Sequence, residues 1–163
     1  MTQMLSCPLL SILIIPSENY SSNYWLQKGN ELCNSGLLQE ALQAYDKALS
    51  IDSNSVDAWN NKGMILAHMK RFEEALESFE GALKIDAKHI FSLCNKGMVL
   101  SQLGRHQEAL NCFDAAIGVD PYFSGAWYNK AMAMQCLGRK REAKAAMKTA
   151  KALEGDNRCG FRK

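Results

Sequence analysis

The sequence predicts an all-α protein, a solenoid of antiparallel helix hairpins. A pattern of small, aromatic and aliphatic residues returns every 34 residues and aligns without a gap. Apolar residues within each segment recur at helical spacing, and the 163 residues include only three prolines, which favours long helices. The four aligned segments, called repeats 1 to 4 below, are residues 22–55, 56–89, 90–123 and 124–157.

Residues 1–21 precede the repeats, and we expect them to form an apolar N-terminal arm and a polar linker. Residues 5–15 (LSCPLLSILII) are too few to cross a bilayer, which needs about 20 apolar residues, and Pro8 interrupts them. No Lys or Arg precedes this segment, so a secretion signal is poorly supported. Of three arrangements, namely packing against the first hairpin, occupation of a groove or detachment, we predict the first.

Each repeat is expected to form two helices of about 12–14 residues, joined by a tight turn. In repeat 2, Trp59, Gly63 and Leu66 share one helical face at spacing i, i+4, i+7. A glycine ends a helix easily because it tolerates positive φ. The turn positions hold Gly36, Lys70, Gly104 and Gly138.

Positions are numbered below from the first residue of each repeat, and two of them carry small residues in every repeat. Position 8 holds Gly29, Gly63, Gly97 and Ala131, and position 20 holds Ala41, Ala75, Ala109 and Ala143. Small residues there let the two helices of a hairpin approach closely, because a larger side chain would overpack the contact.

Repeat 4 carries the features of a cap. A solenoid must cover the apolar side of its last repeat or make it polar. Positions that hold mostly apolar residues in repeats 1–3 hold Lys140, Lys144 and Lys151 in repeat 4. We therefore expect repeat 4 to cap itself, followed by a basic C-terminal tail at residues 158–163.

The chain resembles the tetratricopeptide repeat family. The resemblance rests on the 34-residue period and on that family's Trp, Leu, Gly, Tyr, Ala, Phe, Ala, Pro pattern, and it covers residues 22–157. It implies a right-handed superhelix in which the first helix of each repeat lines a concave groove, and a non-catalytic role as a protein–protein interaction module or scaffold. The sequence departs from the family in keeping the proline only at Pro121, and in a lysine at position 7 where leucine is usual.

The groove that the resemblance implies would be lined by amides and thioethers. Asn61, Asn95 and Asn129 occupy position 6, with Gln27 in repeat 1, and position 9 holds Asn30, Met64, Met98 and Met132. Spacing i, i+3 puts both positions on one helical surface. Amides suit an extended peptide backbone, and methionine adapts to varied apolar side chains. The alternative is that the asparagines satisfy helix ends and the methionines fill the core.

The lysines of position 7 have a structural interpretation. Each of Lys62, Lys96 and Lys130 follows an aspartate by ten residues, across the turn between repeats. We predict ion pairs with Asp52, Asp86 and Asp120. The alternative is that these aspartates cap turns.

Composition and spacing argue against several other functions. A net charge of +2 does not favour nucleic acid or membrane partners, and residues 138–144 (GRKREAK) are interpreted as a solvated face rather than an RNA site. The six cysteines form no CxxC pair and the three histidines fall at unrelated repeat positions, so we expect no metal, no cofactor and no catalysis.

The expected partner is therefore a peptide or protein. A known groove of this family clamps a C-terminal carboxylate, but its basic positions hold Leu26, Phe91 and Asn95 here; only Asn30 and Asn61 match. Six scattered thiols favour a reducing cytoplasm, with export or membrane anchoring through the N-terminus as the alternative. We expect a monomer or a weak homodimer. The alternative function is a structural subunit that self-associates through its apolar N-terminal segment.

Overall fold

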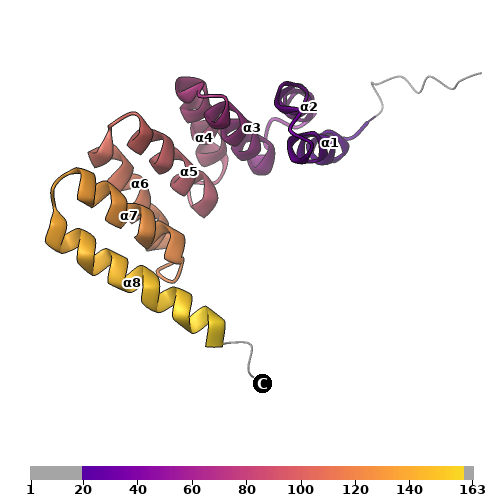
Figure 1. Cartoon of the computed structure of the whole chain (residues 1–163). Helices are drawn as coiled ribbons and strands as arrows, with labels where there is room; N and C mark the ends of the chain where they lie inside the picture. Colours follow the sequence, from indigo (N-terminus) through magenta and orange to yellow (C-terminus); the bar gives the residue numbers. More distant parts are fainter. Residues whose placement is uncertain (1–19, 160–163) are drawn as a thin grey trace, which may run out of the picture.

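The computed structural model describes residues 20–159 as eight α-helices, arranged as four hairpins in a curved array (Figure 1). The helices are α1 (Ser22–Asn34), α2 (Leu38–Ile51), α3 (Val56–His68), α4 (Phe72–Ile85), α5 (Ile90–Gln102), α6 (His106–Val119), α7 (Ser124–Cys136) and α8 (Lys140–Cys159). The predicted all-α solenoid is thus confirmed. The predictions made for residues 1–19 lie outside the described residues.

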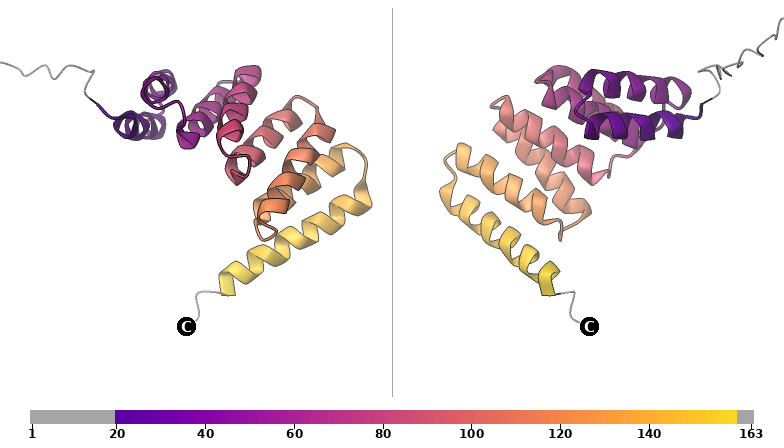
Figure 2. Two further views of the ribbon diagram at one scale, coloured as in Figure 1. Left: turned by 180° about the vertical axis from the view of Figure 1, so that it is seen from behind. Right: turned by 45° about the vertical axis from the view of Figure 1, so that its right-hand side comes forward.

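The helices pack so that the first helices form the inner layer. The two helices of each hairpin contact each other, and each second helix also contacts the first helix of the following hairpin. The first helices α1, α3, α5 and α7 contact one another in order, whereas no such contact joins successive second helices within the described range. The array therefore curves toward the first helices, which line its concave side (Figure 2).

Helix ends follow from a few local residues. Ser21 and Ser55 accept hydrogen bonds from the backbone N–H groups of Tyr24 and Ala58, which caps the first turns of α1 and α3. Inside each hairpin the turn residue has positive φ, at 77° for Gly36, 61° for Lys70, 75° for Gly104 and 75° for Gly138. The predicted breaks are therefore at these residues, and Lys70 adopts a conformation that normally selects glycine.

The close approach predicted at position 8 is explained by an aromatic ring. A Cβ atom on Gly29 would lie 2.5 Å from Tyr45, on Gly63 it would lie 2.6 Å from Phe79, and on Gly97 2.5 Å from Phe113. All three rings are buried. In repeat 4 the pair changes on both sides, to Ala131 and Met147.

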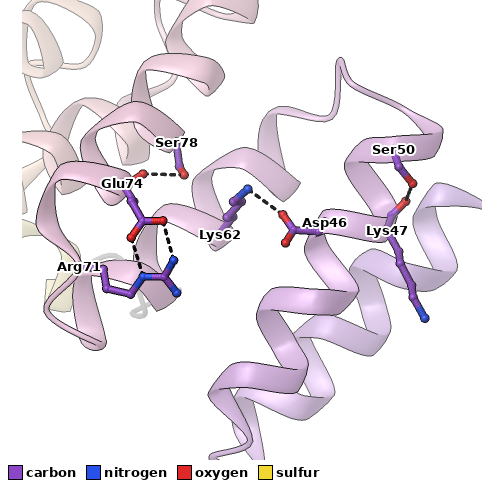
Figure 3. Close-up of polar contacts among 7 residues, drawn as sticks. All are labelled: Asp46, Lys47, Ser50, Lys62, Arg71, Glu74 and Ser78. Carbon is purple, nitrogen blue, oxygen red and sulfur yellow. Dashed lines mark hydrogen bonds and ion pairs between the residues drawn. The ribbon is translucent and has the colours of Figure 1, made fainter.

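The predicted ion pairs have a different acidic partner. Lys62 pairs with Asp46 at 2.7 Å and Lys96 pairs with Glu80 at 2.9 Å; Lys130 likewise pairs with Asp114 (Figure 3 shows the first pair). These pairs do join consecutive repeats, through position 25 of the preceding second helix.

The aspartates that the sequence pattern suggested are engaged elsewhere, so the pairing predicted for them is wrong. Asp52, Asp86 and Asp120 accept from the backbone N–H two residues further on, at 3.0, 2.9 and 2.8 Å. They stabilise the turns between repeats, in agreement with the alternative interpretation.

The C-terminal boundary also differs from the prediction. Helix α8 has 20 residues where the other second helices have 14, and it continues through residues 158 and 159, which were expected to belong to the tail. It extends past the end of α7 (Figure 2).

Candidate functional site

The residues predicted to line the groove lie on the first helices, at the surface. Met64, Met98 and Met132 are 49%, 44% and 42% exposed, so they do not fill the core. The asparagines of position 6 are half-buried, and Gln27 and Asn30 are exposed.

Three pockets follow one another along this surface, one at each junction between repeats. Their volumes are about 450, 220 and 190 Å³. Each is lined by the position 24 aromatic of one repeat and by the position 6 asparagine and position 9 methionine of the next. The sets are Tyr45, Asn61 and Met64; Phe79, Asn95 and Met98; and Phe113, Asn129 and Met132. We call these the junction pockets.

Of the two groove residues predicted in repeat 1, one lines a junction pocket and the other does not. Asn30 lines the first junction pocket, together with Cys33 and His68. Gln27 lines none of the three. The structure therefore brings seven of the eight predicted residues into a single repeating arrangement and leaves Gln27 aside.

The first pocket is organised by hydrogen bonds around Asn30. Its Oδ1 accepts from the Tyr45 hydroxyl at 2.8 Å and from Asn61 Nδ2 at 3.0 Å. Burial raises the pKa of Tyr45 to about 12, so its hydroxyl stays protonated and donates at neutral pH. The asparagine of repeat 2 is thus held against repeat 1.

A residue missed by the sequence analysis, Asn60, carries this network onward. It is only 6% exposed, its Nδ2 donates to Asn61 Oδ1 at 3.3 Å, and its Oδ1 accepts from Asn95 Nδ2 at 3.0 Å and from the buried Ser92 hydroxyl at 3.1 Å. An uninterrupted chain of amides therefore runs from Asn30 to Asn95 across α1, α3 and α5.

Asn60 was missed because position 5 is not repeated. That position holds Leu26, Asn60, Cys94 and Tyr128. The one available signal was a second asparagine next to Asn61, in a helix interior that disfavours this residue.

The junction pockets contain no Asp, Glu, Lys or Arg among their lining residues. Their titratable side chains include His68 and His106, and the Nδ1 atom of His106 is buried without a hydrogen-bond partner in the described part of the chain. Amides, thioethers and aromatic edges therefore dominate the lining of the junction pockets, which lacks carboxylate, ammonium and guanidinium groups.

Within residues 20–159, no cluster of three or more His, Cys, Asp or Glu side chains is arranged to hold a metal ion. No described helix combines the length and the apolar character needed to cross a membrane.

These features define a helical-repeat solenoid with a concave side made by its first helices. Two sequence models described as Tetratricopeptide repeat match residues 54–121 and 94–157, and one described as TPR repeat matches residues 29–70. The chain belongs to the tetratricopeptide repeat family, whose repeats form protein–protein interaction modules.

Solved structures of MamA have a similar fold. One matches with a TM-score of 0.79 at 20% identity, covering 83% of this chain and 80% of that chain. A second matches with a TM-score of 0.76 at 20% identity, covering 87% and 77%. MamA residues 41-end from Desulfovibrio magneticus RS-1 match with a TM-score of 0.75 at 21% identity, covering 82% and 76%. A comparison with curated proteins finds no match to this chain.

Proposed function

We propose that the chain is a scaffold that binds an extended, uncharged peptide segment of a partner protein along its concave side. The observation that carries this proposal is the recurrence of the junction pockets, with one aromatic ring, one amide and one thioether at each. A ligand that meets the same chemistry at three successive junctions is itself expected to be a regular, extended chain.

The chemistry of each junction pocket suits alternating contacts with such a peptide. The exposed thioethers of Met64, Met98 and Met132 can repack around apolar side chains of different shape. The amides can donate to and accept from the peptide backbone. Because no Lys or Arg is among the lining residues, the pockets favour an internal peptide segment over a C-terminal carboxylate.

Hydrogen bonds within the amide network fix the orientation of the asparagine side chains that would contact the peptide. Asn61 and Asn95 are oriented by bonds to Asn30 and Asn60, at 3.0 Å in each case. Because these amides are oriented before the peptide arrives, little conformational entropy is lost on binding.

Selection from a random peptide library, followed by fluorescence anisotropy with one selected peptide, tests the proposal. Asn95→Ala combined with Asn129→Ala should weaken binding by about 1–3 kcal/mol, since each hydrogen bond contributes about 0.5–1.5 kcal/mol. Asn23→Ala with Asn111→Ala is the matched control, because both asparagines are exposed and lie outside the junction pockets.

Thermal unfolding of the same variants separates binding from folding. The groove variant should bind less well than the control, whereas its free energy of unfolding should fall only by the loss of the Asn95–Asn60 hydrogen bond, about 0.5–1.5 kcal/mol. Equal binding by both variants, or selection of peptides that require a free carboxylate, would refute the proposal.

A further inference from the structure

The hairpin α7–α8 differs from the other three in having an open face. Each earlier hairpin is covered by the next first helix; α3, for example, packs against both α1 and α2. Within the described residues nothing covers α7 and α8 in this way, and a groove of about 860 Å³ lies between them. We call it the terminal groove.

The floor of the terminal groove is apolar. It contains Ala131 from α7 and Ala143, Ala145 and Met147 from α8. Ala131 and Ala143 are buried, Met147 is partly buried and Ala145 is exposed. In repeats 1–3 the positions of Ala145 and Met147 hold longer polar residues and aromatic residues, so this floor carries smaller side chains and leaves room for a helix to approach.

The rim of the terminal groove is basic. Its charged residues are Lys140, Arg141, Lys144, Lys148 and Lys151, and no Asp or Glu lines it. The neighbouring carboxylate Glu142 is paired with Arg139, whose Nε donates to it at 2.8 Å. Five cations around an apolar floor complement an apolar stripe flanked by carboxylates.

One of these cations, Lys148, occupies a position that is acidic in the other three repeats. Position 25 is acidic in repeats 1–3, where Asp46, Glu80 and Asp114 pair with the position 7 lysine of the following repeat. In repeat 4 this position holds Lys148. A helix docked here in the geometry of the earlier junctions would therefore present a carboxylate, rather than an ammonium group, toward Lys148.

We propose that the terminal groove docks an acidic amphipathic helix of a partner protein, in the place that a first helix occupies at the earlier junctions. This surface is separate from the junction pockets, and the proposal does not depend on them.

Segments of this chain are poorer occupants of the groove. A second copy stacked through α1 would bring Lys28, at position 7, toward Lys148. Residues 1–19 contain a single carboxylate side chain, Glu18, and residues 160–163 contain none. The charge of the rim therefore favours a partner.

The test uses a fluorescein-labelled synthetic helix of about 15 residues, since shorter isolated helices are marginal in water. It carries leucines at i, i+3, i+4 and i+7 with glutamates on both flanks, and a scrambled peptide of the same composition is the control. We expect the helix to bind the full chain in fluorescence anisotropy, with weaker binding as salt rises. The scrambled peptide should bind much less tightly.

Two sets of variants separate charge from shape. Lys144→Glu with Lys148→Glu should weaken binding about tenfold or more, because reversed rim charges oppose the acidic flanks. Lys84→Glu with Lys88→Glu makes the same change in net charge at exposed residues away from the groove and should have little effect. Ala145→Arg adds a positive charge but fills the groove, so it should also weaken binding.

Circular dichroism first establishes that every variant is folded. The proposal is overturned in favour of unspecific charge attraction by any of three results. These are an equal loss of affinity in both lysine double variants, equal binding of the scrambled peptide, and tighter binding by Ala145→Arg. Self-association in analytical ultracentrifugation that Lys144→Glu with Lys148→Glu abolishes would also overturn it, since the occupant would then be a second copy.

Discussion

Substitution of Gly63 by alanine tests how the hairpins are held together. Two effects of opposite sign are expected. Alanine is a better helix former than glycine by about 1 kcal/mol. Its Cβ would, however, lie 2.6, 2.8 and 2.9 Å from three atoms of the Phe79 ring, which is fully buried. Overpacking of this kind costs about 1–3 kcal/mol.

Three contacts on a rigid ring place the cost of the clash in the upper half of that range, about 2–3 kcal/mol. Gly63→Ala should therefore lower the free energy of unfolding by about 1–2 kcal/mol once the helix propensity is included. Gly118→Ala is the matched control, because a Cβ atom added to Gly118 in α6 would meet no atom within 4 Å, and this variant should become more stable. The difference between the two variants isolates the clash from the propensity.

Urea unfolding followed by circular dichroism gives both free energies. The reasoning is refuted if Gly63→Ala is as stable as Gly118→Ala. A double substitution sharpens the test, since repeat 4 carries alanine and methionine at these two positions. Phe79→Met should cost less in the Gly63→Ala background than in the wild-type chain, by about 1–2 kcal/mol of coupling between neighbours.

Three other substitutions test separate features. Lys70→Gly should stabilise the chain by about 0.5–1 kcal/mol in urea unfolding, because its φ of 61° strains a residue that has a Cβ atom. Asn60→Ala should destabilise it by about 1–3 kcal/mol in the same assay, because Ser92 and Asn95 lose their shared acceptor; an unchanged midpoint would contradict the network. Burial raises the pKa of the Cys94 thiol from 9.0 to about 11, so folding favours the protonated thiol, and stability should fall as the pH rises from about 9 through about 11. Urea titrations at neutral and alkaline pH should show a shallower fall for Cys94→Ala, and equal slopes would contradict this cause.

The fold could be predicted because its determinants are local and repeated. Gly36, Gly104 and Gly138 mark turns by their conformational freedom alone, and the turn at Lys70 could be located because the period puts it in register with them. The close approach at Gly63 followed from its size, although the partner ring became apparent only in the structure.

The acidic partners of the position 7 lysines were predicted wrongly, because they were chosen by their distance along the sequence. Asp52 is close to Lys62 along the chain, but it lies at the end of α2, where its carboxylate accepts a hydrogen bond from the backbone N–H of Asn54. Asp46 is further away in sequence, yet it lies on the face of α2 that meets α3. The signal that identifies the true partner was present, because position 25 is acidic in repeats 1–3 and basic in repeat 4.

The candidate site was predictable only where it repeats. Asn61 and Met64 recur in later repeats at the same spacing, so their shared surface could be inferred. The role of Asn60 could not, because it depends on how α3 and α5 are offset, and this offset places its amide between Ser92 and Asn95. Helix periodicity gives no information about that offset.

The ion pairs between repeats also bear on how such a chain can change in length during evolution. Repeat 2 offers a lysine to the repeat before it and an acid to the repeat after it, as does repeat 3. An in-frame duplication of residues 56–89 would therefore create a junction with the same Lys–Glu pair as an existing one. A copy of repeat 2 inserted after repeat 4 would instead bring its lysine against Lys148. Duplications within the array are thus compatible with its charge pattern, whereas an added repeat beyond the fourth would need a compensating substitution at Lys148.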